Sequence, residues 1–340
     1  MKNLLKEICK ICSVSGGEEY LIDFCKKIFS SYTDDITTDE KNNNLYATFG
    51  KKNAKKRILL DAHIDEVGFI INYINEKGLI KVSPVGGIDK RILPGSQVMI
   101  LNKEKTIGVF GSVPPHLSKS KSKFLSIDEL YIDIGLNDKE KVEELVKIGD
   151  RAIIYSEPRE LINDKFVAGS LDNKAGVAAL ILCAEEISKI DLDNICVTIA
   201  LTSREEVNSL GAKVASYLLE PTECICIDVS FASQNGVPKH KCGEMAKGPM
   251  IGFSPIIDKG IYNKLISICK ENDINYQLEV MGGRTGTNLD YMTESKSGIK
   301  GALVSIPIRY MHSWNEVVDV NDIKDVAKLI SLYIKNGGRL

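Results

Sequence analysis

Residues 195–206 read ICVTIALTSREE, an apolar run of strand length that ends in two adjacent glutamates. The run is typical of a buried strand, so Glu205 and Glu206 are expected just past its end. In open α/β sheets, binding sites form outside the carboxyl ends of strands. Adjacent side chains of an extended segment point in opposite directions, so one carboxylate could bind a ligand while the other transfers protons. The alternative is a solvated acidic turn.

The pattern around this stretch predicts alternating helices and strands from about residue 164 onward. Such alternation indicates an α/β sheet with helices on both faces. Strands of the first 67 residues are expected to join the same sheet. The expected helices are 173–189, 209–219, 259–271 and 320–335, and the expected strands are 195–203, 223–229, 276–281 and 301–307. In the N-terminal part we expect helices at 3–12 and 17–31 and strands at 44–49 and 57–65.

Between these two segments the chain changes character. Short strand-like runs separated by turns predict a β-rich module, with one helix over 138–148 and a basic, Ser-rich loop at Ser118–Lys123. The module is therefore expected as an insertion, residues 68–163, into a catalytic domain made of 1–67 and 164–340. Its expected strands are 69–74, 79–85, 97–101, 106–113 and 130–134.

Composition is that of a globular protein, with 340 residues, 44% hydrophobic and 26% charged, and a net charge of −2. This charge gives no general attraction to nucleic acid or to an anionic membrane. No apolar run approaches the ~20 residues of a membrane span. The N-terminus lacks the features of a signal peptide, so a cytoplasmic location is expected.

Nine cysteines, an odd number, favour a reducing compartment over a disulfide framework. Cys9 and Cys12 form a C-x-x-C within an amphipathic helical pattern, which indicates a half-buried helix face. Cys224 and Cys226 alternate within an expected buried strand. We assign zinc to neither pair.

Four further polar residues lie at strand ends or open a helix: His63, Asp172, Asp228 and His312. Together with Glu206 they supply two imidazoles and three carboxylates. This set is sufficient for two divalent ions if one carboxylate bridges them.

Each of these residues also has a simpler interpretation. Asp172 could cap the helix that it opens, and Asp228 could cap a loop. Of the other two histidines, His116 follows two prolines and His240 lies in a basic loop, and we expect surface or packing roles for both.

Five strings recur in this order in one family, which the chain resembles over essentially its whole length: the TET-type di-metal glutamyl and deblocking aminopeptidases. They are LDAHIDEVG (60–68), SLDNKAG (170–176), EEV (205–207), IDV (227–229) and RYMHS (309–313). Some members are labelled endoglucanase M or cellulase.

The resemblance implies a mixed-sheet, three-layer catalytic domain with an inserted PDZ-like domain that makes dimer contacts. It also implies two divalent metal ions per subunit, with zinc, cobalt and manganese as candidates and zinc or cobalt preferred. Asp172 would bridge the ions, His63 and Asp228 would complete one site, and Glu206 and His312 the other.

For catalysis, the resemblance implies that Glu205 acts as general base on a bridging water and that Asp65 steers His63. The expected substrates are short peptides with a free amino terminus. In related enzymes the peptide bond after the bridging aspartate is cis, so we expect a cis bond between Asp172 and Asn173. A homo-oligomer, built from dimers and in some members dodecameric, is also expected.

Three positions depart from the family pattern: Asn208, Asn288 in place of a common Asp, and Trp314 in place of a usual Pro. Because they could flank the substrate, specificity is not carried over. Arg284 could contact substrate or a neighbouring subunit, or form a surface salt bridge.

Three rival functions stay open at this point. One is a glycosidase, which needs two carboxyls across a sugar and no metal. Another is a di-metal deacylase or carboxypeptidase. The last is a catalytically idle assembly subunit.

Overall fold

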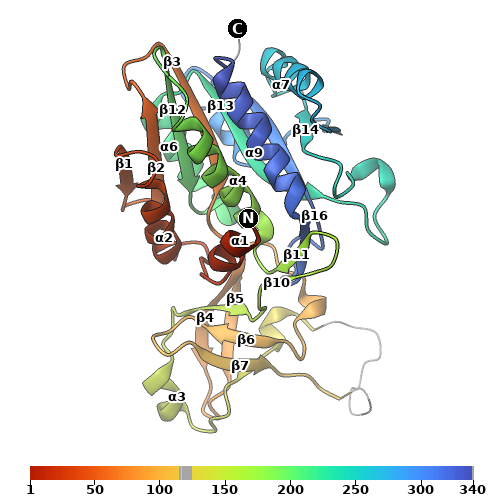
Figure 1. Ribbon diagram of the computed structural model, residues 1–340. Helices are drawn as coiled ribbons and strands as arrows, with labels where there is room; N and C mark the ends of the chain where they lie inside the picture. The colour runs from red at the N-terminus through yellow and green to blue at the C-terminus, as the bar shows by residue number, and fades with distance from the viewer. Residues whose placement is uncertain (115, 117–124, 339–340) are drawn as a thin grey trace.

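The computed structural model describes residues 1–114, 116 and 125–338, and it has two parts (Figure 1). The larger part is built on a mixed sheet that has eleven strands within these residues. The main path of the sheet runs β1(Ile36–Asp39), β2(Asn44–Gly50), β12(Ile195–Thr202), β3(Lys56–His63), β13(Glu223–Phe231), β16(Lys300–Arg309), β17(Glu316–Asp319), β11(Lys165–Ala168) and β10(Arg159–Glu160). A side branch pairs β14(Met250–Phe253) with β16 and with β15(Gln277–Val280).

The centre of this sheet consists of four parallel strands, β12, β3, β13 and β16. Their apolar runs are buried on both faces, as parallel strands between two helical layers require. α4(Leu171–Ile187), α9(Val320–Lys335), α1(Lys2–Cys9) and α7(Lys259–Glu271) pack on one side, while α6(Leu210–Leu219) and α8(Leu289–Met292) pack on the other (Figure 1). α2(Glu19–Phe29) covers the β2 end.

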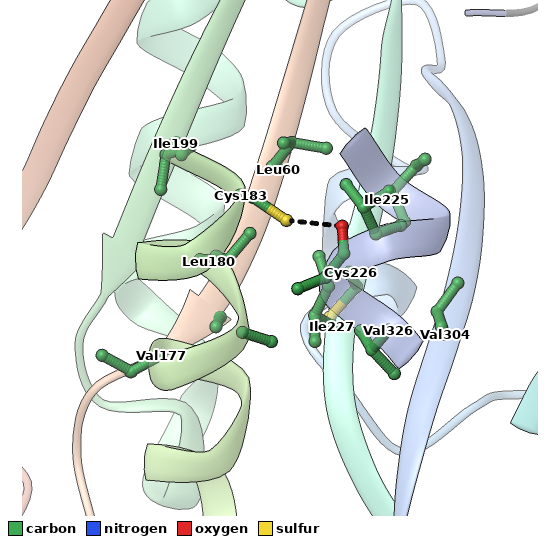
Figure 2. Packing of buried hydrophobic residues seen from close by; sticks show 14 of the residues in the cluster. Leu60, Val177, Leu180, Cys183, Ile199, Ile225, Cys226, Ile227, Val304 and Val326 are labelled. Atoms are coloured by element: carbon green, nitrogen blue, oxygen red, sulfur yellow. Dashed lines mark hydrogen bonds between the residues drawn. The ribbon is translucent and has the colours of Figure 1, made fainter. Parts of the chain in front are cut away.

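Helix α4 is buried almost all round because it packs on the sheet beside α9 and also contacts α1 and α2. Its Val177 and Leu180 pack among sheet residues such as Leu60 and Ile225 (Figure 2). The Cys183 thiol donates a hydrogen bond to the Ala327 carbonyl of α9 at 3.4 Å. The small side chains of α4, which include four alanines and one glycine, permit this close packing.

The smaller part is a closed antiparallel barrel in the order β4-β5-β8-β7-β6-β9. The strands are β4(Gly68–Ile74), β5(Ile80–Val85), β6(Gln97–Ile100), β7(Thr106–Phe110), β8(Ile132–Asp133) and β9(Arg151–Ile154), with α3(Lys139–Leu145) beside them. The barrel has its own core, into which Trp314 packs from the larger part, 6.1 Å from the Phe69 ring.

The expected fold class is therefore confirmed, and the insert that the resemblance likens to a PDZ domain is a six-stranded barrel. The exact boundaries at 67/68 and 163/164 stay a prediction. The expected loop Ser118–Lys123 lies outside the described residues. The sequence patterns missed β1, which lies in a polar edge segment, and the short strands β9, β10, β11, β14 and β17.

The cysteine interpretations also have outcomes. Cys224 and Cys226 are buried in β13, as expected. Cys9 is the last residue of α1, whereas Cys12 lies beyond the helix end, and both are partly buried and free. In the described ranges, no helix combines the length and apolar character needed to cross a bilayer.

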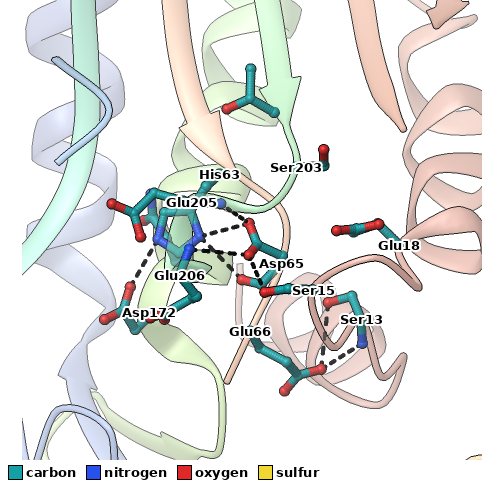
Figure 3. Close-up of polar contacts among 12 residues, drawn as sticks. Ser13, Ser15, Glu18, His63, Asp65, Glu66, Asp172, Ser203, Glu205 and Glu206 are labelled. Carbon is teal, nitrogen blue, oxygen red and sulfur yellow. Dashed lines mark hydrogen bonds and ion pairs between the residues drawn. The ribbon is translucent and has the colours of Figure 1, made fainter. Parts of the chain in front are cut away.

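A buried ion pair ties the N-terminal segment to the sheet and to α4. Lys174 Nζ lies 3.0 Å from Glu66 Oε1 and donates to the Ile11 carbonyl at 2.7 Å. The same Glu66 oxygen accepts the Ser13 amide at 2.6 Å (Figure 3). Because the Lys174 side chain is only 1% exposed, each charge depends on the other for compensation.

We expect Lys174→Met to lower the free energy of unfolding by about 3–5 kcal/mol, because the Glu66 carboxylate would stay buried without its cation. Urea unfolding of the metal-free protein measures this change, since bound metal would add its own stabilisation. The double variant Lys174→Met/Glu66→Leu should recover part of the loss. A single variant that unfolds at the wild-type urea concentration would contradict this role.

Candidate active site

The expected site residues come from separate stretches of chain that meet at one edge of the sheet. His63 ends β3, and Asp228 lies in the adjacent parallel strand β13. Glu206 lies in α5(Glu205–Asn208), which directly follows β12. Asp172 stands in the first turn of α4, and His312 lies in the turn between β16 and β17. The carboxyl ends of parallel strands thus bring these residues together.

Asp172 is at the centre of this group. Its Oδ1 lies 3.0 Å from His63 Nε2, and its Oδ2 lies 3.4 Å from His312 Nε2. Asp228 Oδ1 is 3.6 Å from His63 Nε2, and Glu206 Oε2 is 3.6 Å from His312 Nε2. Each oxygen of Asp172 therefore faces a different imidazole, and each imidazole has a further carboxylate beside it.

Hydrogen bonds on the far side of both rings define their tautomers. His63 Nδ1 lies 3.1 Å from the Asp65 carbonyl, and His312 Nδ1 lies 2.9 Å from the Gly87 carbonyl, which follows β5 of the barrel. A carbonyl oxygen only accepts, so in each neutral ring Nδ1 carries the proton and Nε2 presents its lone pair. Both lone pairs then point at carboxylate oxygens, an arrangement that requires a cation or a proton between them.

A buried glutamate that the sequence patterns did not single out holds two of these segments. Glu316 accepts the Asp172 amide at 2.9 Å and the His312 amide at 2.8 Å. Glu316 belongs to none of the five sequence strings. Its role follows only from its place at the start of β17, next to the turn that carries His312. The peptide bond between Asp172 and Asn173 is cis, as expected.

Asp65 has a broader structural role than the expected steering of His63. Its carboxylate accepts the Glu205 amide at 2.9 Å, the Glu206 amide at 3.2 Å and the Ser15 hydroxyl at 2.6 Å (Figure 3). Its Oδ1 is 3.5 Å from His63 Nδ1, farther than its own backbone carbonyl. Asp65 therefore holds the start of α5 against the end of β3.

The expectation that Glu205 and Glu206 lie in an extended segment is wrong. They form the first turn of α5, after Arg204 in the left-handed region at φ 56°. The amides at this helix start need acceptors, and Asp65 supplies them. Both glutamates nevertheless reach the same cavity because the turn is short.

The pKa values of the acidic side chains in the cluster are shifted because several carboxylates lie close together and are shielded from water. Burial raises the pKa of Glu205 to about 8, and the charge of Asp228 adds to the effect. Burial also raises the pKa of Glu206, with Asp172 as a further cause. Burial acts to raise the pKa of Asp172, but hydrogen bonds from the two imidazoles, whose own pKa values are raised and which carry Nε2 protons in the metal-free protein, outweigh burial and lower it. Positive charge at the centre would relieve this repulsion.

The donor set fits a metal centre. One ligand atom each from His63, Asp172 and Glu206 lies within 4.8 Å of the others, and all three side chains are largely shielded from solvent. Imidazole nitrogen with carboxylate oxygen suits zinc, cobalt or manganese. Glu205 shares this cavity of about 850 Å³ but forms no part of that compact group.

The departures from the family pattern have structural explanations. Asn288 is buried and donates to Asp61 Oδ2 and to the Thr202 hydroxyl, both at 2.9 Å, beneath the site. Trp314 packs on the barrel core. Asn208 ends α5 and accepts from Lys213 at 2.6 Å.

The remaining candidates lie outside the cluster. Arg284 is exposed and lies 3.4 Å from Glu294, which matches the surface salt bridge interpretation. His240 is exposed at the edge of the cavity, and His116 is exposed on the insert. Neither histidine joins the His63–Asp172–Glu206 group.

Comparison with known proteins agrees with this arrangement. Residues 43–329 match the M42 glutamyl aminopeptidase family. The chain is 30% identical over 332 residues to a lysyl aminopeptidase of Pyrococcus furiosus, covering 96% of this chain and 94% of the relative. The TET1 peptidase of Pyrococcus horikoshii, which assembles into a tetrahedron or a large octahedral shell, superimposes with a TM-score of 0.84 at 32% identity, covering 97% of each chain.

A structure described as an endoglucanase, from Thermotoga maritima, is also similar, with a TM-score of 0.79 and 29% identity over 98% of this chain and 97% of that one. The family match covers most of the chain, including all seven expected site residues. The chain therefore belongs to the M42 glutamyl aminopeptidase family and is a metallo-aminopeptidase.

Proposed function

We propose that this protein removes the N-terminal residue from short peptides by metal-dependent hydrolysis, with Glu205 as general base. Two divalent ions, zinc or cobalt, would be held by five side chains. Asp172 would bind both ions, His63 and Asp228 would complete one site, and Glu206 and His312 the other.

One observation carries this proposal: the two oxygens of Asp172 face two different Nε2 lone pairs. A single imidazole beside an aspartate would be compatible with an ordinary buried hydrogen bond. Two imidazoles oriented alike across one carboxylate match a bridged pair of cations.

When bound, the ions supply positive charge that polarises the scissile carbonyl and makes an attacking water more acidic. Glu205 lines the cavity beside the His63–Asp172–Glu206 group without belonging to it, so its carboxylate is available to move a proton. Its carboxylate would accept a proton from the attacking water and deliver it to the leaving nitrogen. In the metal-free protein burial raises its pKa to about 8, and cations bound beside it would lower that pKa, so that the carboxylate can accept the proton.

Asp65 would act as a positioning residue. Because its carboxylate binds the amides of Glu205 and Glu206, it sets the place of the base relative to the metal-binding side chains. His312 is positioned partly by Gly87, so the barrel contributes to the site even though its own side chains lie elsewhere.

The glycosidase alternative rests on names given to relatives. A glycosidase needs two carboxyls facing across a sugar and no imidazole pair. Two Nε2 lone pairs directed at one carboxylate support metal-dependent hydrolysis instead. A di-metal deacylase would share the metal site and differ only in requiring no free amino terminus.

We expect Glu205→Gln to retain two metal equivalents and to lose about 10²–10⁴-fold in kcat, because the amide cannot accept the proton. Turnover of amino-acid anilides and metal analysis on the same samples measure both effects. Glu271→Gln, at an exposed glutamate of α7, is the matched control. Retained turnover in Glu205→Gln would remove Glu205 from this role.

Chelation should abolish hydrolysis of peptides with a free amino terminus, and zinc or cobalt should restore it at two equivalents per subunit. Asp172→Ala should lose both equivalents because it contacts both imidazoles. N-acylated peptides and cello-oligosaccharides serve as comparison substrates. Cleavage of cello-oligosaccharides that survives chelation would favour the glycosidase, and cleavage of acylated peptides the deacylase.

We also propose a homo-oligomer built from dimers through the insert at 68–163. β7 exposes Ile107 (49%) and Val109 (39%), an apolar strip on the outside of the closed barrel that is suited to a partner. Light scattering should give a mass of twice 37.5 kDa or a higher even multiple, and Ile107→Asp/Val109→Asp should reduce it. A wild-type monomer would count against this proposal and leave the hydrolysis untouched.

A further inference from the structure

A carboxylate that takes no part in the proposed metal site lies in the same cavity. Glu279, on β15, accepts hydrogen bonds from the Ser305 hydroxyl at 2.7 Å and from the Ser230 hydroxyl. Ser305 is the direct neighbour of Asp228 in the parallel register, and Ser230 follows Asp228 by two residues on the same face of β13. Glu279 therefore lies beside the cluster and is held in place from the sheet.

The charge of Glu279 lacks a compensating cation. Within the described part of the chain, Glu279 forms no ion pair with a basic side chain, and Asp228 is the charged neighbour that acts on it. The two serines occupy two of roughly four acceptor positions of the carboxylate. Burial, the largest cause, raises the pKa of Glu279. A largely buried carboxylate that has free acceptor positions and no cation beside it would bind a cationic group strongly.

Apolar side chains line the cavity beside Glu279. Met250 and Leu303 are buried there, whereas Leu278 and Val280, the neighbours of Glu279 on β15, project to the opposite face of the strand and are exposed. Such walls suit an aliphatic chain with a charge at its end, because methylenes cover apolar surface while the charged group meets its partner.

We propose that Glu279 selects peptides whose N-terminal residue carries a cationic side chain, lysine or arginine. This inference rests on the proposed function, because it places the substrate's first residue in this cavity. The distance from the proposed metal site to Glu279 suits such a side chain. Asp228 belongs to the metal site, and Ser230, which binds Glu279, lies about 7 Å farther along the same strand. A four-carbon lysine stem covers a comparable length from the reacting carbonyl to the ammonium.

The cavity also has a positively charged side chain, which would favour an acidic N-terminal residue over a basic one. Lys241 lies at the cavity edge and would suit an acidic N-terminal residue. However, Lys241 is exposed, so water screens its charge, whereas Glu279 is held by two serines away from bulk solvent. The fixed carboxylate should therefore dominate selection.

The test compares the p-nitroanilides of lysine, norleucine and glutamate with metal-loaded wild type, Glu279→Gln and Lys241→Gln. Norleucine has the lysine stem without the ammonium. Wild type should prefer lysine over norleucine, and Glu279→Gln should reduce that kcat/KM ratio about 10- to 100-fold, mainly through KM. The matched Lys241→Gln variant should not reduce it.

A wild type that prefers norleucine or glutamate overturns the inference, and so does an unchanged lysine ratio in a folded Glu279→Gln. Calorimetric binding of L-lysine amide and L-norleucine amide separates this outcome from failure of the proposed function. If no anilide is hydrolysed, the proposed hydrolysis fails, and the two amides still decide selectivity. Equal affinity of wild type for both amides overturns the inference.

Discussion

The orientation of two imidazole rings is the constraint on which the rest of the site depends. His63 and His312 each donate Nδ1–H to a backbone carbonyl, and this directs both Nε2 lone pairs at the Asp172 carboxylate. A lone pair facing an anion is unfavourable unless positive charge lies between them. The backbone thus orients both rings before any cation binds, with a place between ring and carboxylate that a proton or a cation must fill, and this reduces the reorganisation needed for function.

Helix ends and buried acids keep these rings and carboxylates in place. Asp65 satisfies amides at the start of α5, and Glu316 satisfies the amides of Asp172 and His312. Each acid joins segments that are distant in the chain, so the site geometry is coupled to the fold. The Gly87 carbonyl, which follows β5 of the barrel, binds His312 of the larger part. Two residues along the chain from His312, Trp314 packs on Phe69 of the barrel, so both contacts join the two parts beside the site.

The contacts around Asn288 explain why this chain differs from the family pattern at that position. Asn288 lies against the buried Asp61, where burial already raises the carboxyl pKa to about 6. An aspartate at that position would place a second carboxylate against Asp61, whereas the amide donates to it. Glu279 illustrates the converse case, because nothing in its local sequence marks it, and its importance arises from two serines on other strands.

The sequence by itself determined the alternation of strands and helices, the inserted β-rich module and the candidate residues at strand ends, because burial periodicity and strand-end position are local properties. It could not predict β1 or the helical turn at Glu205, since an edge segment and a four-residue helix carry little periodicity. Only the tertiary structure decided that the Asp65 carboxylate binds the α5 amides, that Glu316 joins two segments and that Glu279 faces the cavity. These contacts join residues many positions apart, and their partners are chosen by strand order and register rather than by neighbours in the chain.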